Sequence, residues 1–245
     1  MRRIPDARPE WAYFFDFDGT LVHLAPAPGE VRLDADFRHV LEQLYLFTGG
    51  AIAIVTGRSI ADIDRLFPEE PYPVAGQHGF ELRGSATTSD ETDSTRLTAA
   101  VDELDAIVSA HDGLLLERKG HSLALHYRAA PSLGGYAHRL VRRLQRELGD
   151  DYAVQSGKRV VELRPAGHDK GRAILNFMTQ EPFAGRLPIF VGDDATDESG
   201  FAAVNAAGGH SLKVGPGPTC AEFRFPNVEA VRNWLQRAVA PEASR

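Results

Sequence analysis

The chain has 245 residues, of which 43% are hydrophobic, so it can bury a sizeable core and is not expected to be disordered. Its 27 basic and 34 acidic side chains give a formal charge of −7, which disfavours a polyphosphate partner such as nucleic acid. Cys220 is the single cysteine, which excludes an internal disulfide and a cysteine-rich zinc site. Its apolar runs are far shorter than the roughly 18 residues that span a bilayer. We therefore expect a cytoplasmic monomer with no nucleic-acid or membrane partner.

Three short apolar runs each end abruptly at polar residues. They cover residues 11–15, 51–55 and 187–191. Such bounded, β-rich runs are typical of buried parallel strands. Asp16 and Thr56 directly follow the first two runs, and Asp193 follows the third after one glycine. Because ligands bind beyond the carboxyl ends of the strands in open α/β sheets, these polar residues are predicted to meet at one site.

Helical periodicity occupies the intervals between these runs. The predicted helices cover residues 37–47, 59–66, 169–178, 196–204 and 228–239. Ser59, Asp169 and Thr196 are the expected N-caps of the second, third and fourth helices. The alternation of strands and helices indicates an α/β fold with a doubly wound, mostly parallel sheet.

The middle of the chain has a different pattern. Residues 85–96 are polar without an apolar period and are expected to form a linker or exposed loop. The elements predicted after it are a helix, two strands, a helix and two strands, at residues 97–110, 114–118, 122–127, 133–148, 152–155 and 160–163. This αββαββ segment is predicted to be a small antiparallel α+β domain, inserted after a third strand region at residues 74–82. The predicted domains are residues 1–90 with 166–245, and residues 91–165.

The first run leads into an aspartate pair, Asp16-Phe-Asp18-Gly-Thr. Residues i and i+2 of a strand face the same side, so both carboxylates could point together at the strand end. Two such carboxylates repel each other, so a cation or a shared proton is expected between them. An ordinary Asp-Gly turn is the alternative, although a turn needs only one aspartate.

A second acidic motif follows the third run, with four acids within six residues: Asp193, Asp194, Asp197 and Glu198. A helix start would account for Asp197 and Glu198, because acidic side chains are favourable near a helix N-terminus. It does not account for Asp193 and Asp194. Hard oxygen ligands at two strand ends suit Mg²⁺.

Two further features have weaker signals. Lys170 lies in the first turn of a predicted helix, where a cation opposes the macrodipole, so it is either a surface lysine or a phosphate contact. The acidic motifs favour the phosphate contact. Thr56-Gly57-Arg58 ends a strand before a helix, where free N–H groups can hold a phosphate, although an ordinary β-α turn is the alternative.

Together and in this order, the four motifs resemble the haloacid dehalogenase superfamily of phosphotransferases, whose members have a Rossmannoid core and often an inserted cap domain. The resemblance implies that Asp16 attacks phosphorus to form an aspartyl-phosphate. It implies that Asp18 protonates the leaving oxygen and then deprotonates water. It also implies a Mg²⁺ ion held by Asp16, the Asp18 carbonyl and Asp193, with Asp194 and Asp197 as supporting or alternative ligands.

The same resemblance gives roles to the residues that face the phosphate. Thr56 and Lys170 would bind the phosphoryl oxygens, and Lys170 would also offset the charge of the carboxylates. Gly57 and Arg58 are assigned to substrate binding beside them.

Longer segments along nearly the whole chain resemble the trehalose-6-phosphate phosphatases. They are FFDFDGTL, VTGR, VAGQHGFEL, ERKGHSLALHYR, SGKRVVELRP, DKGRA and FVGDDATDE. The segments of the inserted domain are the more specific ones, since many phosphatases share the others. This resemblance implies trehalose 6-phosphate as substrate, with Glu117, Lys119, Lys158 and Glu162 contacting the sugar hydroxyls. Taken alone, these charges could also be the solvated face of a sheet.

The sequence leaves alternatives for the roles of two more residues and for the substrate. His78 is either a substrate contact or structural, and Arg128 either binds the ligand or anchors the cap. A rival function is a capped phosphatase for sucrose phosphate, mannosyl-phosphoglycerate or a hexose phosphate. A second rival is a catalytically silent sugar-phosphate sensor.

Overall fold

The computed structural model describes residues 3–25, 30–68, 72–85, 94–157 and 159–240. The chain divides into two compact units. The core unit comprises Met1–Thr88 and Asp169–Arg245, and the inserted unit comprises Ser89–His168.

The described part of the core unit contains a seven-stranded sheet in the order β11-β10-β9-β1-β2-β3-β4. Its strands are β1 (Trp11–Phe15), β2 (Ile52–Val55), β3 (Val74–Gly76), β4 (Glu81–Arg83), β9 (Leu187–Gly192), β10 (His210–Val214) and β11 (Phe223–Phe225). All neighbours pair in parallel except β3 and β4. The predicted doubly wound, mostly parallel sheet is therefore confirmed.

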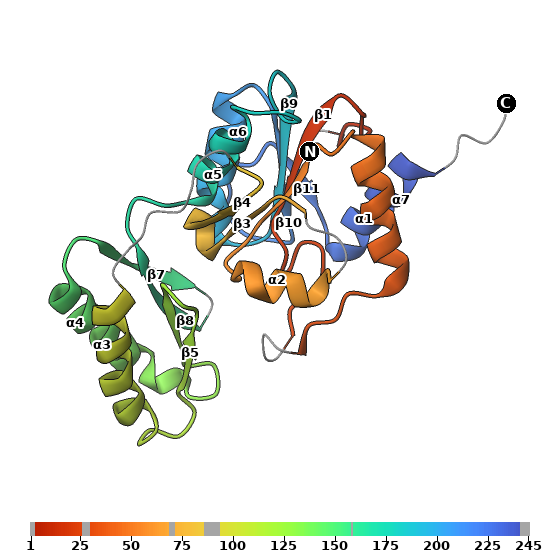
Figure 1. The fold of residues 1–245 in the computed structure, drawn as a ribbon. Helices are drawn as coiled ribbons and strands as arrows, with labels where there is room; N and C mark the ends of the chain where they lie inside the picture. The colour runs from red at the N-terminus through yellow and green to blue at the C-terminus, as the bar shows by residue number, and fades with distance from the viewer. Residues whose placement is uncertain (1–2, 26–29, 69–71, 86–93, 158, 241–245) are drawn as a thin grey trace, which may run out of the picture. The chain divides into compact units, whose positions relative to one another are not determined.

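Helices cover both faces of this sheet (Figure 1). They are α1 (Ala35–Phe47), α2 (Ile60–Leu66) and α7 (Val228–Val239) on one face, and α5 (Lys170–Phe177) and α6 (Glu198–Ala206) on the other. Alternate residues of β1 serve the two faces, since Tyr13 packs in the first cluster and Phe14 in the second, and both are fully buried. Burying such a side chain contributes roughly 1.5–3 kcal/mol. The central strand is thus fixed from both sides.

Two of the three predicted helix caps are confirmed and one is wrong. Ser59 accepts the Asp62 N–H at 3.1 Å, and Asp169 accepts the Arg172 N–H at 2.9 Å. The predicted cap Thr196 lies inside a 3-10 turn, Ala195–Asp197, that leads into α6. The N-cap is Asp194, whose side chain and that of Asp197 accept each other's backbone N–H groups in a capping box. This reciprocal pair satisfies two backbone donors, where a single threonine hydroxyl would satisfy one.

The third strand region does not run through residues 74–82 as predicted. The chain forms β3, turns through a 3-10 segment at Gln77–Gly79, and returns as the antiparallel edge strand β4. Gln77, His78 and Gly79 have φ values of 46°, 58° and 100°. Three successive left-handed residues reverse the chain, which an apolar pattern cannot reveal.

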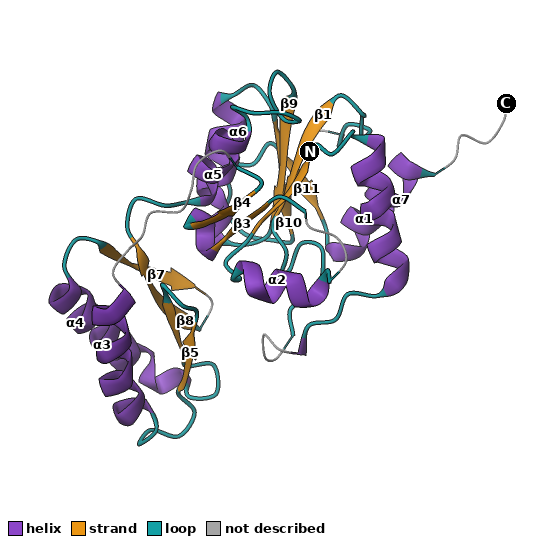
Figure 2. Cartoon of the chain, viewed as in Figure 1, coloured by secondary structure: helices purple, strands orange, loops and turns teal. Residues whose placement is uncertain are grey.

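The inserted unit has the predicted αββαββ order. Its elements are α3 (Ser94–Val108), β5 (Leu115–Arg118), β6 (Leu123–His126), α4 (Gly134–Leu148), β7 (Tyr152–Gly157) and β8 (Val160–Pro165). The strands form an antiparallel sheet in the order β5-β6-β8-β7, with α3 and α4 on one face (Figure 2). Leu123, Leu125, Val161 and Leu163 of this sheet pack against those helices.

The predicted linker at residues 85–96 is shorter than expected. Its last three residues, Ser94 to Arg96, already belong to α3. The part at 86–93 lies outside the described residues. Within the described ranges, no helix has both the length and the apolar character needed to cross a membrane.

The capping box generates a stability prediction. Asp194→Ala should lower the free energy of unfolding by about 1 kcal/mol, because the Asp197 N–H loses its side-chain acceptor and keeps only the Asp194 carbonyl, at 3.2 Å. Thr196→Ala is the matched control and should change it by less than about 0.5 kcal/mol. Urea unfolding in the presence of a chelator measures both. Equal losses in the two variants would contradict the assignment of the cap to Asp194.

Candidate active site

The aspartate pair lies at the carboxyl end of β1, in the middle of the sheet. Register pairs Phe15 with Val191 of β9, so the next residues of both strands emerge side by side. Gly19 has a φ of +82°, and a Cβ there would overlap the Asp193 carboxylate. Glycine therefore lets the tip of β9 approach the first motif closely.

Three carboxylates gather at these strand ends. Asp16, Asp193 and Asp197 each offer an oxygen, and these oxygens all lie within 4.8 Å of one another. The strand order reverses between β1 and β9, which is where open α/β sheets bind ligands. One cation could therefore contact Asp16 and Asp193 together.

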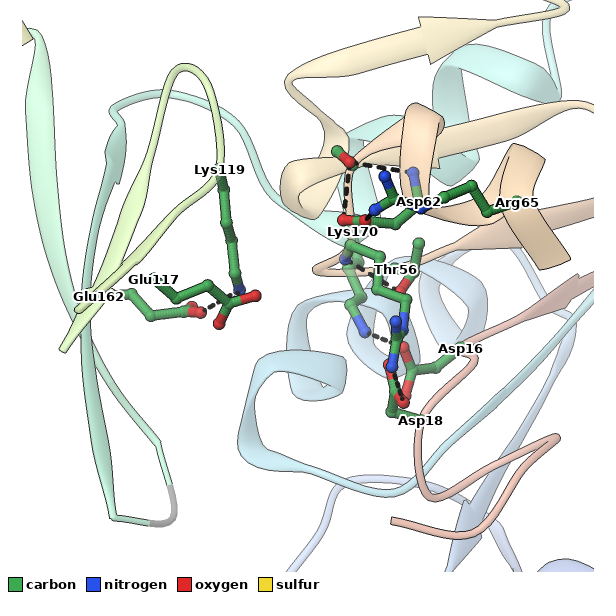
Figure 3. A network of polar contacts seen from close by, with 11 residues as sticks. Asp16, Asp18, Thr56, Asp62, Arg65, Glu117, Lys119, Glu162 and Lys170 are labelled. Carbon is green, nitrogen blue, oxygen red and sulfur yellow. Dashed lines mark hydrogen bonds and ion pairs between the residues drawn. The ribbon is translucent and has the colours of Figure 1, made fainter. Parts of the chain in front are cut away.

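Lys170 bonds to two members of this cluster and is 2% exposed. Figure 3 shows it beside Asp16. Its ammonium donates to Asp16 Oδ1 at 2.7 Å and to Asp197 Oδ1 at 2.6 Å. The other oxygen of Asp197 accepts the N–H groups of Asp193 and Asp194, both at 2.8 Å. Asp197 thus ties Lys170 to the loop that carries Asp193.

The charges of the cluster shift the pKa values of its members. Burial disfavours the charged form of Lys170, but Asp16 and Asp197 outweigh burial and raise the pKa of its ammonium. Burial raises the pKa of Asp16 well above its usual range; Lys170 opposes this shift, while Asp197 and Asp193 add to it. One ammonium among three carboxylates leaves an excess of negative charge. An all-oxygen set of ligand atoms with this charge could hold a metal cation.

Thr56 and Gly57 form a turn at the end of β2. The Thr56 N–H donates to the Ala75 carbonyl at 2.8 Å, and its hydroxyl accepts the Arg58 N–H at 3.2 Å. His78 lies beside this turn: its N–H donates to the Thr56 carbonyl at 2.9 Å. A Cβ at Gly57 would come within 2.7 Å of the His78 ring. His78 is therefore a direct neighbour of the predicted phosphate-binding turn.

Arg58 binds Asp18 in a bidentate ion pair that the sequence did not reveal. Its Nε donates to Asp18 Oδ2 at 2.5 Å and its Nη2 to Oδ1 at 2.7 Å. The guanidinium also lies 5.7 Å from the centre of the Phe17 ring. The two residues are 40 positions apart, and only the shared location at strand ends could have suggested the contact.

Two other polar residues support the site and were missed. Glu81 accepts the Ile60 N–H at 2.6 Å and the side-chain amide of Gln77, which joins the start of α2 to the left-handed turn. Lys213 is buried on β10 and donates to the Asp193 carbonyl. The sequence did contain a signal for each of them. Lys213 lies near the end of an apolar strand, and Glu81 is an acidic residue just after a turn that contains glycine.

In the inserted unit, charged side chains lie on the sheet face opposite α3 and α4. Glu117 and Glu162 both pair with Ala124 in the register, so all three share this face. Lys119 directly follows β5, and its ammonium is 2.8 Å from Glu162 Oε1 and 3.9 Å from Glu117 Oε2 (Figure 3). The sheet thus brings three of the predicted sugar-binding residues together.

A further residue of this unit, His126, was not predicted. It is hydrogen-bonded through Nε2 to Glu117 Oε2 at 2.8 Å. Two predicted residues remain. Arg128 is exposed in the loop after β6. Lys158 lies outside the described residues.

Solved structures share the fold of the chain. The C-terminal domain of trehalose-6-phosphate phosphatase from C. albicans matches it with a TM-score of 0.80 at 22% identity, over 95% of this chain and 92% of that one. The mostly parallel sheet, with an acidic, lysine-bridged cluster where its strand order reverses, is the arrangement that the resemblance to the haloacid dehalogenase superfamily predicted.

Sequence comparisons narrow this class. The family model for trehalose-phosphatase matches residues 14–222. Trehalose-6-phosphate phosphatase from Escherichia coli (strain K12) is 39% identical over 239 residues, 96% of this chain and 89% of that protein. The probable trehalose-phosphate phosphatase of Sinorhizobium fredii is 42% identical over 228 residues, 91% of this chain and 85% of that protein. The chain belongs to the trehalose-phosphatase family.

The buried cluster generates a prediction about stability and pH. Lys170→Met should lower the free energy of unfolding by about 3–5 kcal/mol at pH 7, because it leaves Asp16 and Asp197 buried without their cation. The deficit should shrink as the pH falls toward 5. Lys170 opposes the rise that burial causes in the pKa of Asp16, so its removal raises that pKa further. The folded variant then takes up a proton at a higher pH than the folded wild type and gains more stability on acidification.

Urea unfolding of a chelator-treated protein at several pH values measures this effect. The double variant Lys170→Met with Asp197→Asn is the control, and it should be more stable than Lys170→Met alone because one unpaired charge is gone. A Lys170→Met protein as stable as the wild type at pH 7 would contradict the assigned charge balance.

Proposed function

We propose that the protein hydrolyses trehalose 6-phosphate to trehalose and phosphate through an aspartyl-phosphate on Asp16, with Mg²⁺ as cofactor. The observation that carries this proposal is the buried cluster in which Lys170 bridges Asp16 and Asp197 beside Asp193. Membership of the trehalose-phosphatase family supports the choice of substrate.

Asp16 is the nucleophile in this proposal. Lys170 fixes its Oδ1, and Oδ2 is the oxygen assigned to attack phosphorus. A bond forms between this oxygen and phosphorus while the bond from phosphorus to the sugar oxygen breaks. Water then attacks the phosphorus of the acyl phosphate, which releases phosphate and restores the Asp16 carboxylate.

Asp18 is the proposed general acid and base. It gives a proton to the departing sugar oxygen and takes one from the attacking water. Arg58 holds both of its oxygens in the structure, so at least one of these bonds must open before Asp18 transfers a proton. An Arg58 side chain released in this way can bind a phosphoryl oxygen, which agrees with its predicted place in substrate binding.

The phosphoryl group is proposed to bind at the turn after β2. Thr56 and the backbone of Gly57 can donate hydrogen bonds there, and Lys170 can neutralise negative charge from the side of Asp16. The contacts of His78 with both turn residues support a role in shaping this turn.

Asp16, Asp193 and the Asp18 carbonyl are the proposed holders of Mg²⁺. The ion, when bound, supplies positive charge to the phosphoryl oxygens. Asp194 and Asp197 are proposed to support this metal site without binding the ion. Asp194 caps the helix turn, and both Asp197 oxygens accept hydrogen bonds from protein donors.

We propose that the inserted unit is the cap domain and recognises the sugar. Glu117, Lys119 and Glu162 present acceptors and a donor on one sheet face, which suits a polyhydroxylated ligand. Lys158 and Arg128 are assigned to the same role from the sequence alone. A cytoplasmic location and a monomeric state stay predictions of the sequence.

Phosphate release from a panel of sugar phosphates tests the proposed function. The panel contains trehalose 6-phosphate, sucrose 6-phosphate, mannosyl-phosphoglycerate and glucose 6-phosphate, each with Mg²⁺ and with a chelator. The kcat/KM for trehalose 6-phosphate should exceed the others by at least about 100-fold, the effect of two good polar contacts. Activity should disappear with the chelator and return with Mg²⁺.

The alternatives give different results. A higher kcat/KM for mannosyl-phosphoglycerate or sucrose 6-phosphate would assign the protein to another sugar phosphate. Tight binding of a sugar phosphate without turnover would indicate a sensor.

A further inference from the structure

His126 lies at the end of β6, on the same sheet face as the charged residues of the inserted unit. The register pairs it with Leu115 and Val160, two positions along from Ala124 in the row that contains Glu117 and Glu162. Its Nε2 is 2.8 Å from Glu117 Oε2. The bond carries a proton on Nε2, since a carboxylate only accepts.

The two partners differ in how firmly the sheet holds them. Glu117 lies on β5, which is an edge strand, whereas His126 lies on β6, which is paired on both sides. The hydrogen bond therefore anchors an edge-strand carboxylate to the interior of the sheet. Lys119 is the cation beside Glu117: its ammonium is 3.9 Å from Glu117 Oε2 and 2.8 Å from Glu162 Oε1.

The electrostatic environment agrees with this anchoring. Burial alone would raise the pKa of Glu117, but the hydrogen bond from His126 and the charge of Lys119 outweigh burial and lower it. Glu117 is thus held as a carboxylate, with Oε2 engaged by His126.

We propose that His126 is a positioning residue that orients the Glu117 carboxylate so that Oε1 can accept a hydrogen bond from a substrate hydroxyl. The inference rests on the proposed function, because it takes the polar face of the inserted unit as the sugar-binding face. His126 acts through Glu117, so its effect is on recognition of the sugar and not on the transfer of phosphate.

Paired substitutions at His126 test this inference. Asn stops short of the Nε2 position, whereas the Gln amide can reach it, so His126→Asn removes the donor and His126→Gln retains one. Turnover is measured with trehalose 6-phosphate and with p-nitrophenyl phosphate, which has no sugar. His126→Asn should raise the KM for trehalose 6-phosphate about tenfold, as expected for a weakened hydrogen bond to a charged group, with kcat within about twofold. His126→Gln should recover most of this loss.

Further variants control the result. His126→Met fills a similar volume without a donor and should match His126→Asn, so it serves if the Asn protein does not fold. His111→Asn is the matched control, since His111 bonds to the Ile107 carbonyl at 2.8 Å at the end of α3 and should leave the KM unchanged. Combining His126→Asn with Glu117→Gln should add little to the loss caused by Glu117→Gln, because both changes break one interaction.

Two outcomes would overturn the inference. One is an unchanged KM for trehalose 6-phosphate in a folded His126→Asn or His126→Met protein. The other is an equal fall in turnover of p-nitrophenyl phosphate, which would indicate general damage. Failure of the proposed function has a different signature, because the wild-type protein itself would then show no preference for trehalose 6-phosphate.

Discussion

One buried ammonium group is the interaction on which the site depends. Lys170 lies between Asp16 and Asp197, and Asp197 in turn holds the backbone of the loop that carries Asp193. Without this cation, three neighbouring carboxylates, two of them buried, would repel one another. With it, the charge of one carboxylate is offset, and the bond to Asp16 is made through Oδ1. In the proposed function, the contacts that stabilise this cluster also hold Asp16 for its attack on phosphorus.

The fold makes this cluster possible by bringing distant segments to one point. The strand order reverses between β1 and β9, and open α/β sheets bind their ligands at such a reversal. The side chains of β1 are all apolar and point alternately to the two faces of the sheet, so the strand packs between two helical layers. Gly19 then lets the neighbouring carboxylate approach. The inserted unit, taken by itself, has a polar sheet face whose charges are paired among themselves.

The features that could be predicted from the sequence are those encoded by residues close together in the chain. The apolar runs predicted the strands, and the polar residues at their ends predicted the convergence of Asp16 and Asp193. Ion pairs between residues far apart in the sequence, such as that of Arg58 with Asp18, could not be predicted, because they depend on which way each side chain turns. The cap of α6 was placed on Thr196 because the reciprocal bonds of Asp194 and Asp197 depend on backbone geometry. Hydrophobic periodicity and secondary-structure propensity describe one helix or strand at a time. These contacts instead join residues of different elements or of the turns between them.

Chemical trapping of the phosphorylated protein tests the central claim most directly. The protein is mixed with trehalose 6-phosphate and quenched with borohydride, which reduces an acyl phosphate to an alcohol, and its peptides are then sequenced by mass spectrometry. The account predicts that the reduced residue is Asp16 and that Asp16→Asn gives no reduced residue and no turnover. Reduction at another carboxylate, or sustained turnover by Asp16→Asn, would contradict it.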